Sequence, residues 1–465
     1  MKKIAILLAT ASFLPLMPAR ADEASLQAEI ALLKQQVAAQ NQTIAAQTAR
    51  LDQLEAQMRS GSALAVQQNG APSSIASTAP ELAASPVPTG AETPNTAPTL
   101  ALASPSASDT TIGGYGEITY NGYVHNASRN QADLNRFVLF FGHRFNDKLS
   151  FNSEVEVEHA VSSSEDQGEV EIEQAYLNYT IKPALNVKAG LFLMPFGFIN
   201  RNHEPPVFFG VERNEVETRI IPSTWREGGV GLWGSTSFGL SYDVGITTGF
   251  DVAKLDDAGA PLRGSHQELQ LAKAASLSVY GSLEYMPTPG LLIGGAIFHG
   301  GATHSNADFR RDDTLPDFAG VNAKVTLWDV HGRWQHNGLD LQALYARGTI
   351  SRAAALDGVI AAYNTAHGTE LPVAPSAFYG WLIQGAYSFP LGSTITLDPF
   401  VRYELYNTQA SLPVGFTADP ANRDRILTTG LSFHPLHEVV VKVDYQKFFE
   451  NSTNDRVNLG LGYMF

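Results

Sequence analysis

The chain has 465 residues, of which 44% are apolar, 17% are charged and none is cysteine. Its net charge of −15 argues against a nucleic-acid partner, because binding to phosphates requires a basic surface. No apolar run reaches the ~18 residues that a membrane-spanning helix needs. If the protein lies in a membrane, a closed β-barrel is the remaining way to satisfy its backbone.

The first 21 residues have the features of a secretory signal peptide. Lys2 and Lys3 form the basic start, residues 4–17 form the apolar stretch, and residues 19–21 form a small-x-small cleavage site. We therefore expect an exported protein whose mature chain begins at Asp22. The absence of cysteine is consistent with an exported protein that makes no use of disulfides.

Residues 22–59 carry two series of side chains that recur every seven positions. The series are Ile30, Val37, Ile44, Leu51 and Met58, and Leu26, Leu33, Gln40, Gln47 and Leu54. This pattern predicts a short parallel coiled coil, and its two glutamines leave dimer and trimer both open. Residues 60–110 are dominated by Ala, Ser, Pro, Thr and Gly, which predicts a disordered linker.

From residue 111 to residue 465 the chain repeats stretches of about ten residues that alternate between apolar and polar. In the last ten residues, Val457, Leu459, Leu461, Tyr463 and Phe465 share one face, as in the closing strand of an outer-membrane barrel. The expected strands are 114–123, 134–145, 149–159, 169–181, 185–193, 228–234, 240–248, 277–286, 291–299, 321–335, 339–348, 378–389, 394–405, 426–434, 439–447 and 456–465. The predicted fold is an all-β transmembrane barrel of about sixteen antiparallel strands.

The connections between these strands are sorted by length. Short turns such as 146–148 and 336–338 alternate strictly with long connections such as 194–227 and 349–377. Outer-membrane barrels have short periplasmic turns and long outer loops, whereas a soluble sandwich has no reason for this alternation. We therefore expect the outer membrane of a Gram-negative bacterium, with outer-membrane lipid around the barrel and the N-terminal segment in the periplasm.

The third long connection, residues 194–227, combines aromatic residues, prolines and charges of both signs. Such a segment has enough apolar content to pack against a wall, so we expect it to fold into the lumen. The charged and histidine side chains expected at the pore constriction are Arg201, His203, Glu204, Glu212, Arg213, Glu215, Glu217, Arg219 and Arg226.

Short motifs in this region carry a family resemblance. The segments 173–176, 190–197, 203–206 and 225–228 resemble the porin superfamily that includes the phosphate-selective porins O and P, and the barrel pattern extends the resemblance over residues 111–465. The resemblance implies a trimeric, sixteen-stranded diffusion channel with its third loop folded inward. It also implies phosphate selectivity through basic residues that line the pore.

The charge pattern departs from that family. Glu154, Glu156 and Glu158 share one face of a predicted strand, and Glu169, Glu171 and Glu173 follow on the next strand. Charged side chains that face lipid are costly, so we expect these carboxylates to line the lumen or its rim. Acidic rings favour cations, and 38 acidic residues face 25 basic ones after residue 110. We therefore expect a general or weakly cation-preferring pore.

Motifs for catalysis or cofactor binding are not found. The string Gly229 to Gly234 matches a dinucleotide fingerprint but lies within a predicted strand, without the required helix. His203 and Glu204 are neighbours but lack a third ligand, so we expect a loop histidine and no metal site. We expect no catalytic residues, no cofactor and no enzyme activity.

The favoured interpretation is a homotrimeric porin for passive diffusion of small hydrophilic solutes or ions. Two alternatives remain open. One is an outer-membrane barrel hydrolase, which would need a Ser/His pair near the outer rim. The other is a barrel that serves as an anchor while the coiled coil contacts peptidoglycan and tethers the envelope.

Overall fold

The computed structural model describes residues 109–163, 166–304 and 315–465. In this part of the chain, seventeen strands form one antiparallel sheet. The strands are β1 (Thr110–Tyr123), β2 (Gln131–Arg144), β3 (Leu149–Glu158), β4 (Val170–Lys182), β5 (Leu185–Leu193), β6 (Arg226–Ser235), β7 (Leu240–Thr247), β8 (Ser278–Thr288), β9 (Leu291–Gly301), β10 (Lys324–His336), β11 (Leu339–Ile350), β12 (Ala377–Tyr387), β13 (Phe389–Pro390), β14 (Thr396–Ser411), β15 (Arg423–Leu436), β16 (Val439–Phe448) and β17 (Arg456–Met464).

The sheet closes on itself, because β1 pairs with both β2 and β17. Strand β13 has only two residues. It follows β12 and, like β12, pairs with β14, so that sixteen strands form the wall. The predicted sixteen-stranded antiparallel barrel is therefore confirmed. Strand boundaries differ from the expected ones by a few residues, as at β14, which extends to Ser411.

Side chains alternate between the two faces of the wall, as the period of a strand requires. On β17, Val457, Leu459 and Leu461 are exposed on the outside, whereas Asn458 is fully buried on the inside. The same alternation places Ile118, Ile172, Val244, Ile293, Val330, Val401 and Val443 on the outer face. An apolar outer band with polar side chains inside is the arrangement of a barrel that is solvated by lipid.

Within the described residues, helices are confined to the connections. They are α2 (Val216–Arg219), α3 (Ala353–His367) and the 3-10 turns η1 (Ala127–Arg129), η2 (Pro205–Val207), η3 (Val252–Lys254), η4 (Pro420–Asn422) and η5 (Ser452–Asn454). Among the described residues, no helix is long and apolar enough to cross a membrane. The connection 349–377 was identified from the sequence only by its length, and the structure shows that it contains α3.

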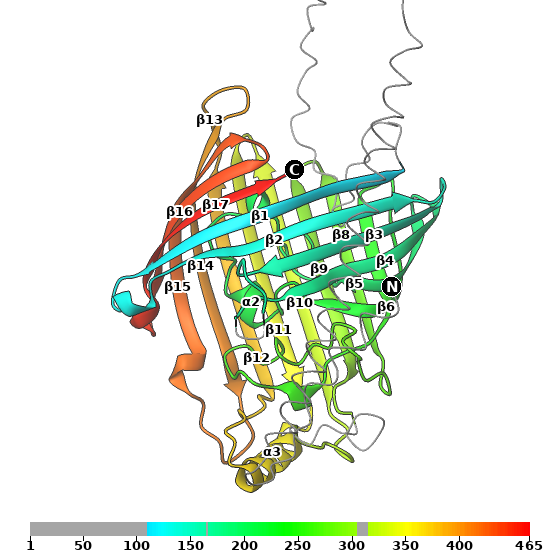
Figure 1. Cartoon of the computed structure of the whole chain (residues 1–465), viewed down its shortest axis with the longest axis vertical. Coiled ribbons are helices and arrows are strands. Elements are labelled where there is room, and N and C mark those ends of the chain that lie inside the picture. Colours follow the sequence, from blue (N-terminus) through cyan, green and yellow to red (C-terminus); the bar gives the residue numbers. More distant parts are fainter. Residues whose placement is uncertain (1–108, 164–165, 305–314) are drawn as a thin grey trace, which may run out of the picture. The chain divides into compact units, whose positions relative to one another are not determined.

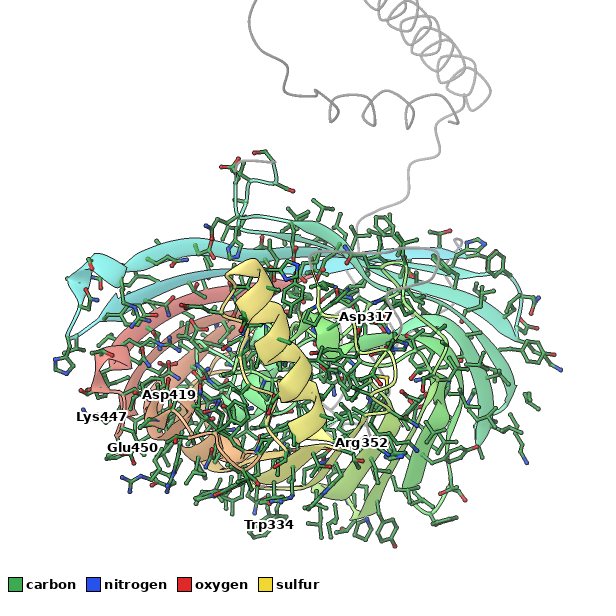
Figure 2. The ribbon with its side chains drawn as sticks, turned by 90° about the horizontal axis from the view of Figure 1, so that it is seen from below. Asp317, Trp334, Arg352, Asp419, Lys447 and Glu450 are labelled. Carbon is green, nitrogen blue, oxygen red and sulfur yellow. The ribbon has the colours of Figure 1, made fainter. Side chains whose placement is uncertain are left out.

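All long connections emerge at one end of the barrel, and the short turns and the C-terminus lie at the other end (Figure 1). Seen from the long-loop end, α3 crosses the barrel opening (Figure 2). Leu356 and Ile360 are one helical turn apart and are buried, so they fix the face that α3 turns towards the interior.

An apolar cluster fills part of the interior near the long loops. Trp225, Phe250, Phe298, Leu356 and Phe378 belong to this cluster, although they come from three connections and from strands β9 and β12. The cluster packs these connections against the inner face of the wall.

Several predictions fall outside the described residues. The signal peptide (1–21), the coiled coil (22–59) and all but the last two residues of the linker (60–110) are in that part of the chain. Strand β1 begins at Thr110. The prediction that the third long connection ends at residue 227 is wrong by two residues, because Arg226 already belongs to β6.

Candidate functional site

The connection between β5 and β6, residues 194–225, is folded into the barrel, and we call it loop 3. Phe209 stacks on Phe400 of β14 with ring centroids 5.9 Å apart. The backbone N–H of Val211 donates to Asp444 Oδ2 of β16 at 2.6 Å, and Lys442 Nζ donates to the Gly210 carbonyl at 2.8 Å. Because β14 lies half-way round the ring from β5, loop 3 spans the lumen.

Helix α2 fixes a second part of loop 3 to the wall (Figure 1). The backbone N–H of Glu215 donates to Glu404 Oε2 of β14 at 2.7 Å. Val216 and Ile220 lie over Gly380 of β12, where an added Cβ would come within 3.2 Å of either side chain. The absence of a side chain at Gly380 therefore lets the helix approach the wall closely.

The two ends of loop 3 are joined by Asn200. Its side-chain nitrogen donates to the Met194 carbonyl at 2.8 Å and to the Trp225 carbonyl at 2.9 Å, and its oxygen accepts from the Trp225 N–H at 2.7 Å. The ring of Trp225 is fully buried and lies 5.0 Å from the ring of Phe250. These contacts close the base of the loop.

Glu217 was expected at the constriction, but it holds loop 3 together from within. Its Oε1 accepts from the backbone N–H groups of Phe198 at 2.6 Å and Ile199 at 2.9 Å. Its Oε2 accepts from the Asn214 side chain at 2.7 Å. Burial raises the pKa of Glu217, although these three hydrogen bonds act to lower it. Its side chain is 3% exposed and is not available to a passing solute.

Replacing Glu217 with alanine is expected to unlock this turn, because two buried backbone N–H groups lose their acceptor. Each buried N–H group that is left without an acceptor lowers the folding stability by about 1–3 kcal/mol. Hydrogen exchange at residues 198–199 should then become faster than in the wild type, while exchange in the wall strands stays unchanged. Glu217→Gln, which keeps one acceptor oxygen, is the control and should show a smaller effect. Unchanged exchange in Glu217→Ala would contradict this role.

The other side chains expected at the constriction are spread along loop 3. Arg201 lies 3.5 Å from Asp243 and 3.8 Å from Glu284, so it approaches the β7–β8 wall. Arg213 donates to Ser223 at 2.5 Å and Thr224 at 2.8 Å within the loop. Burial lowers the pKa of Arg213, and the neighbouring charge of Arg136 adds to this effect.

Near the far wall, loop 3 presents a group of alternating charges. Arg219 contacts Glu215 at 2.5 Å, and Glu215 also lies 3.7 Å from Arg456 of β17. Burial acts to raise the pKa of Glu215, but Arg219 and Arg456 outweigh it and lower that pKa. Glu212 accepts from Asn121 of β1 at 2.7 Å.

The glutamates of β3 and β4 point to the inside and meet part of loop 3. Glu154, Glu156 and Glu173 are each at most 1% exposed, and Glu171 is half-buried. Glu158 and Glu169 lie farther along, where the Glu158 N–H donates to the Glu169 carbonyl at 3.0 Å next to the long connection. The structure therefore brings together four of the six glutamates and places two at the rim.

Basic side chains compensate part of this acidic wall. Arg136 lies 3.5 Å from Glu117 and 3.5 Å from Glu156. Arg226 lies at the start of β6 and not on loop 3, and it contacts Glu171 of β4 at 2.5 Å and Glu268 of the connection after β7 at 3.0 Å.

His203, on loop 3, lies against the same acidic wall with Glu204 buried beside it. Its Nε2 is 3.7 Å from a carboxylate oxygen of Glu154 and 3.7 Å from one of Glu173. Burial alone would lower the pKa of His203, but these carboxylates outweigh burial and raise the pKa to about 10.

The polar partners of loop 3 on the opposite walls were not predicted from the sequence. They are Asp243, Glu284, Asp329, His331, Arg402, Glu404, Lys442 and Asp444, all buried on inward positions. The period of two along each strand was the signal that could have found them, because every second polar residue of an apolar strand faces the lumen.

Comparison with known proteins relates the barrel to a family. The model of the family described as phosphate-selective porin O and P matches residues 113–232, which include most of β1, strands β2 to β5 and loop 3. An uncharacterized protein of Aquifex aeolicus is 32% identical over 361 residues, covering 76% of this chain and 79% of that protein. The structure of OmpF of Salmonella typhi in complex with daunomycin is similar in fold. It has a TM-score of 0.53 and 16% identity, over 77% of this chain and 98% of that chain.

Proposed function

We propose that this chain, which belongs to the outer-membrane porins that resemble the phosphate-selective porin O and P family, is a diffusion channel narrowed by loop 3. The observation that carries the proposal is the path of loop 3, which leaves the wall at β5 and is bonded to β14 and β16. Small hydrophilic solutes or ions pass the remaining opening without a chemical step. The protein is therefore assigned no enzyme activity.

The proposed channel crosses the outer membrane of a Gram-negative bacterium. The apolar outer face of the barrel contacts lipid, and the long connections with α3 lie on the outer side. The short turns and the N-terminal segment then lie in the periplasm. We propose a homotrimer, which is the assembly that the family resemblance implies.

Selection in this channel depends on its width and on the charges along loop 3. Acidic residues outnumber basic ones by 38 to 25 after residue 110, which favours cations. Much of the acidic wall is compensated by Arg136 and Arg226, so the preference should be weak. Arg201, Arg213 and Arg219 are the side chains that would favour anions if they control the narrowest point.

Two single substitutions test this assignment, because they should shift the ion selectivity in opposite directions. Removing the charge of Glu212 (Glu212→Gln) should make the channel less cation-selective, and removing the charge of Arg219 (Arg219→Gln) should make it more so. A roughly twofold change in the permeability ratio is expected for each, which corresponds to the ~0.4 kcal/mol of a screened charge interaction. The measurement is the reversal potential of the purified protein in a planar bilayer with a salt gradient.

The two variants are controls for each other, because both alter loop 3 without altering its length. Equal shifts in the same direction would show that the side chains act on the loop conformation and not on passing ions. An anion-selective wild type would assign the narrowest point to the arginines. The absence of any protein-dependent conductance would overturn the channel function itself.

A further inference from the structure

Three buried side chains from separate parts of the chain converge where loop 3 meets the acidic wall. Glu154 comes from β3, Glu173 from β4 and His203 from loop 3, and one ligand atom of each lies within 4.8 Å of the others. His203 Nε2 is 3.7 Å from Glu154 Oε1 and 3.7 Å from Glu173 Oε2. These distances are too long for hydrogen bonds, so the three groups face a common space.

The atoms that face this space have no hydrogen-bond partner. They are both carboxylate oxygens of Glu173, Oε1 of Glu154 and Nε2 of His203. The hydroxyl of Tyr115, whose ring lies 5.9 Å from the imidazole of His203, is also buried without a partner. A buried carboxylate without a partner is costly, and such groups are normally found paired or bound to a metal ion.

The surrounding charges do not balance. Glu171 is paired with Arg226 at 2.5 Å. This leaves the carboxylates of Glu117, Glu154, Glu156 and Glu173 against the guanidinium groups of Arg136 and Arg213. Among these six groups, the carboxylates exceed the guanidinium groups by two charges when every carboxyl group is ionised and His203 is neutral. A proton on His203 would supply one positive charge, and a divalent cation would supply both.

We propose that Glu154, Glu173 and His203 bind a divalent transition-metal ion, of which Zn²⁺ is the probe, and that this ion fastens loop 3 to β3 and β4. Zinc bonds of about 2.0–2.2 Å to nitrogen and oxygen place neighbouring ligand atoms of a tetrahedral site about 3.4 Å apart. The observed separations of 3.7 Å are close to this value. A water molecule or the Tyr115 hydroxyl completes the coordination.

The donor set selects the class of metal. An imidazole nitrogen suits zinc, iron, nickel or copper, whereas calcium and magnesium prefer oxygen ligands alone. The test of this site is independent of the channel function, because metal binding is measured separately from conductance.

The test measures metal in the full-length protein purified in detergent after expression in medium that contains zinc. Elemental analysis should find about one zinc per chain in the wild type, after a brief wash with a weak chelator that removes surface ions. The variants His203→Gln and Glu173→Gln should lose this zinc. Removing zinc with a strong chelator should also speed hydrogen exchange in residues 194–225 of the wild type, and re-adding zinc should reverse it.

His331 offers a matched control in the same lumen. It is a buried histidine between two carboxylates, with Nδ1 2.6 Å from Asp329 and Nε2 3.6 Å from Glu284. The carboxylates lie at opposite ring nitrogens, so one ion cannot contact both of them and one ring nitrogen. His331→Gln should therefore retain the zinc.

Two results would overturn the proposal. One is a wild-type protein that folds in the presence of zinc but holds none. The other is zinc that stays in both His203→Gln and Glu173→Gln. Folding of each variant is checked by the heat-dependent gel shift of a barrel. If one variant does not fold, Glu154→Gln replaces it, and chelation of the wild type tests the site without any substitution.

Discussion

Replacing Trp225 with alanine is expected to destabilise the packing at the base of loop 3 by about 3–5 kcal/mol. Trp225 is fully buried, and its ring lies 4.9 Å from Phe196, 5.0 Å from Phe250 and 5.0 Å from Phe298. Its indole N–H donates to Glu227 at 3.0 Å, which is a further buried bond that the variant loses. The cavity cannot be filled by the rigid wall, so the loop and the connection after β7 should become mobile.

The consequence for the channel is an unstable opening. We expect a larger mean conductance with strong current noise, together with faster hydrogen exchange in residues 194–225. Trp334→Ala is the matched control, because Trp334 is 46% exposed on the outer face and stacks on His336. That control should leave loop 3 and the current unchanged. A quiet, wild-type current in Trp225→Ala would contradict the role of loop 3.

Adding a side chain at Gly462 is expected to push loop 3 off the wall. Gly462 faces inward on β17, where an added Cβ would lie 2.2 Å from Cβ of Pro205 and 3.1 Å from Val440. Ordinary carbon contacts need about 3.5–4.0 Å, so Gly462→Val forces η2 to move by more than an ångström. Overpacking of this kind costs about 1–3 kcal/mol, and the displaced segment should alter the single-channel conductance.

Gly281→Val controls for the loss of a strand glycine. The only atom near a Cβ at Gly281 is Cγ1 of Val244 at 3.5 Å, which is an ordinary contact. The control should keep the wild-type melting temperature and conductance. If Gly462→Val has the conductance and the hydrogen exchange of the wild type, then Pro205 does not occupy the lumen beside β17 in the membrane.

The wall of the barrel could be predicted from sequence because its signal is local. Alternation along β17 assigns Val457, Leu459 and Leu461 to the lipid face and Asn458 to the interior without reference to any other strand. The alternation of short and long connections then gives the antiparallel order, and the closed barrel follows because every strand edge must be paired in lipid.

Helix α3 was missed although its signals are present. Leu356 and Ile360 are four residues apart, and Gly368 follows with φ of 66° as the left-handed residue that ends the helix. The segment 353–367 is rich in alanine, so its apolar face is weak, and the strand pattern defined this connection only by its length. Reading connections with the helical period as well would have found it.

The contacts of loop 3 could not be predicted from sequence. The partners of His203 lie on β3 and β4, and the acceptors for Val211 and Glu215 lie on β16 and β14. These pairs depend on how the barrel closes and on the depth of each residue in the wall. The sequence shows which side chains can form hydrogen bonds or ion pairs. It does not distinguish a buried carboxylate such as that of Glu217 from a carboxylate that faces a passing solute.

The most direct test of a channel narrowed by loop 3 is the single-channel conductance of the wild type and Trp225→Ala in planar bilayers under the same salt. The account predicts discrete conductance steps for the wild type, in groups of three if the protein is a trimer, and larger, noisier steps for the variant. Equal conductance in the two proteins, with loop 3 shown by hydrogen exchange to be loosened, would contradict the narrowing. No steps from correctly folded wild-type protein would contradict the channel.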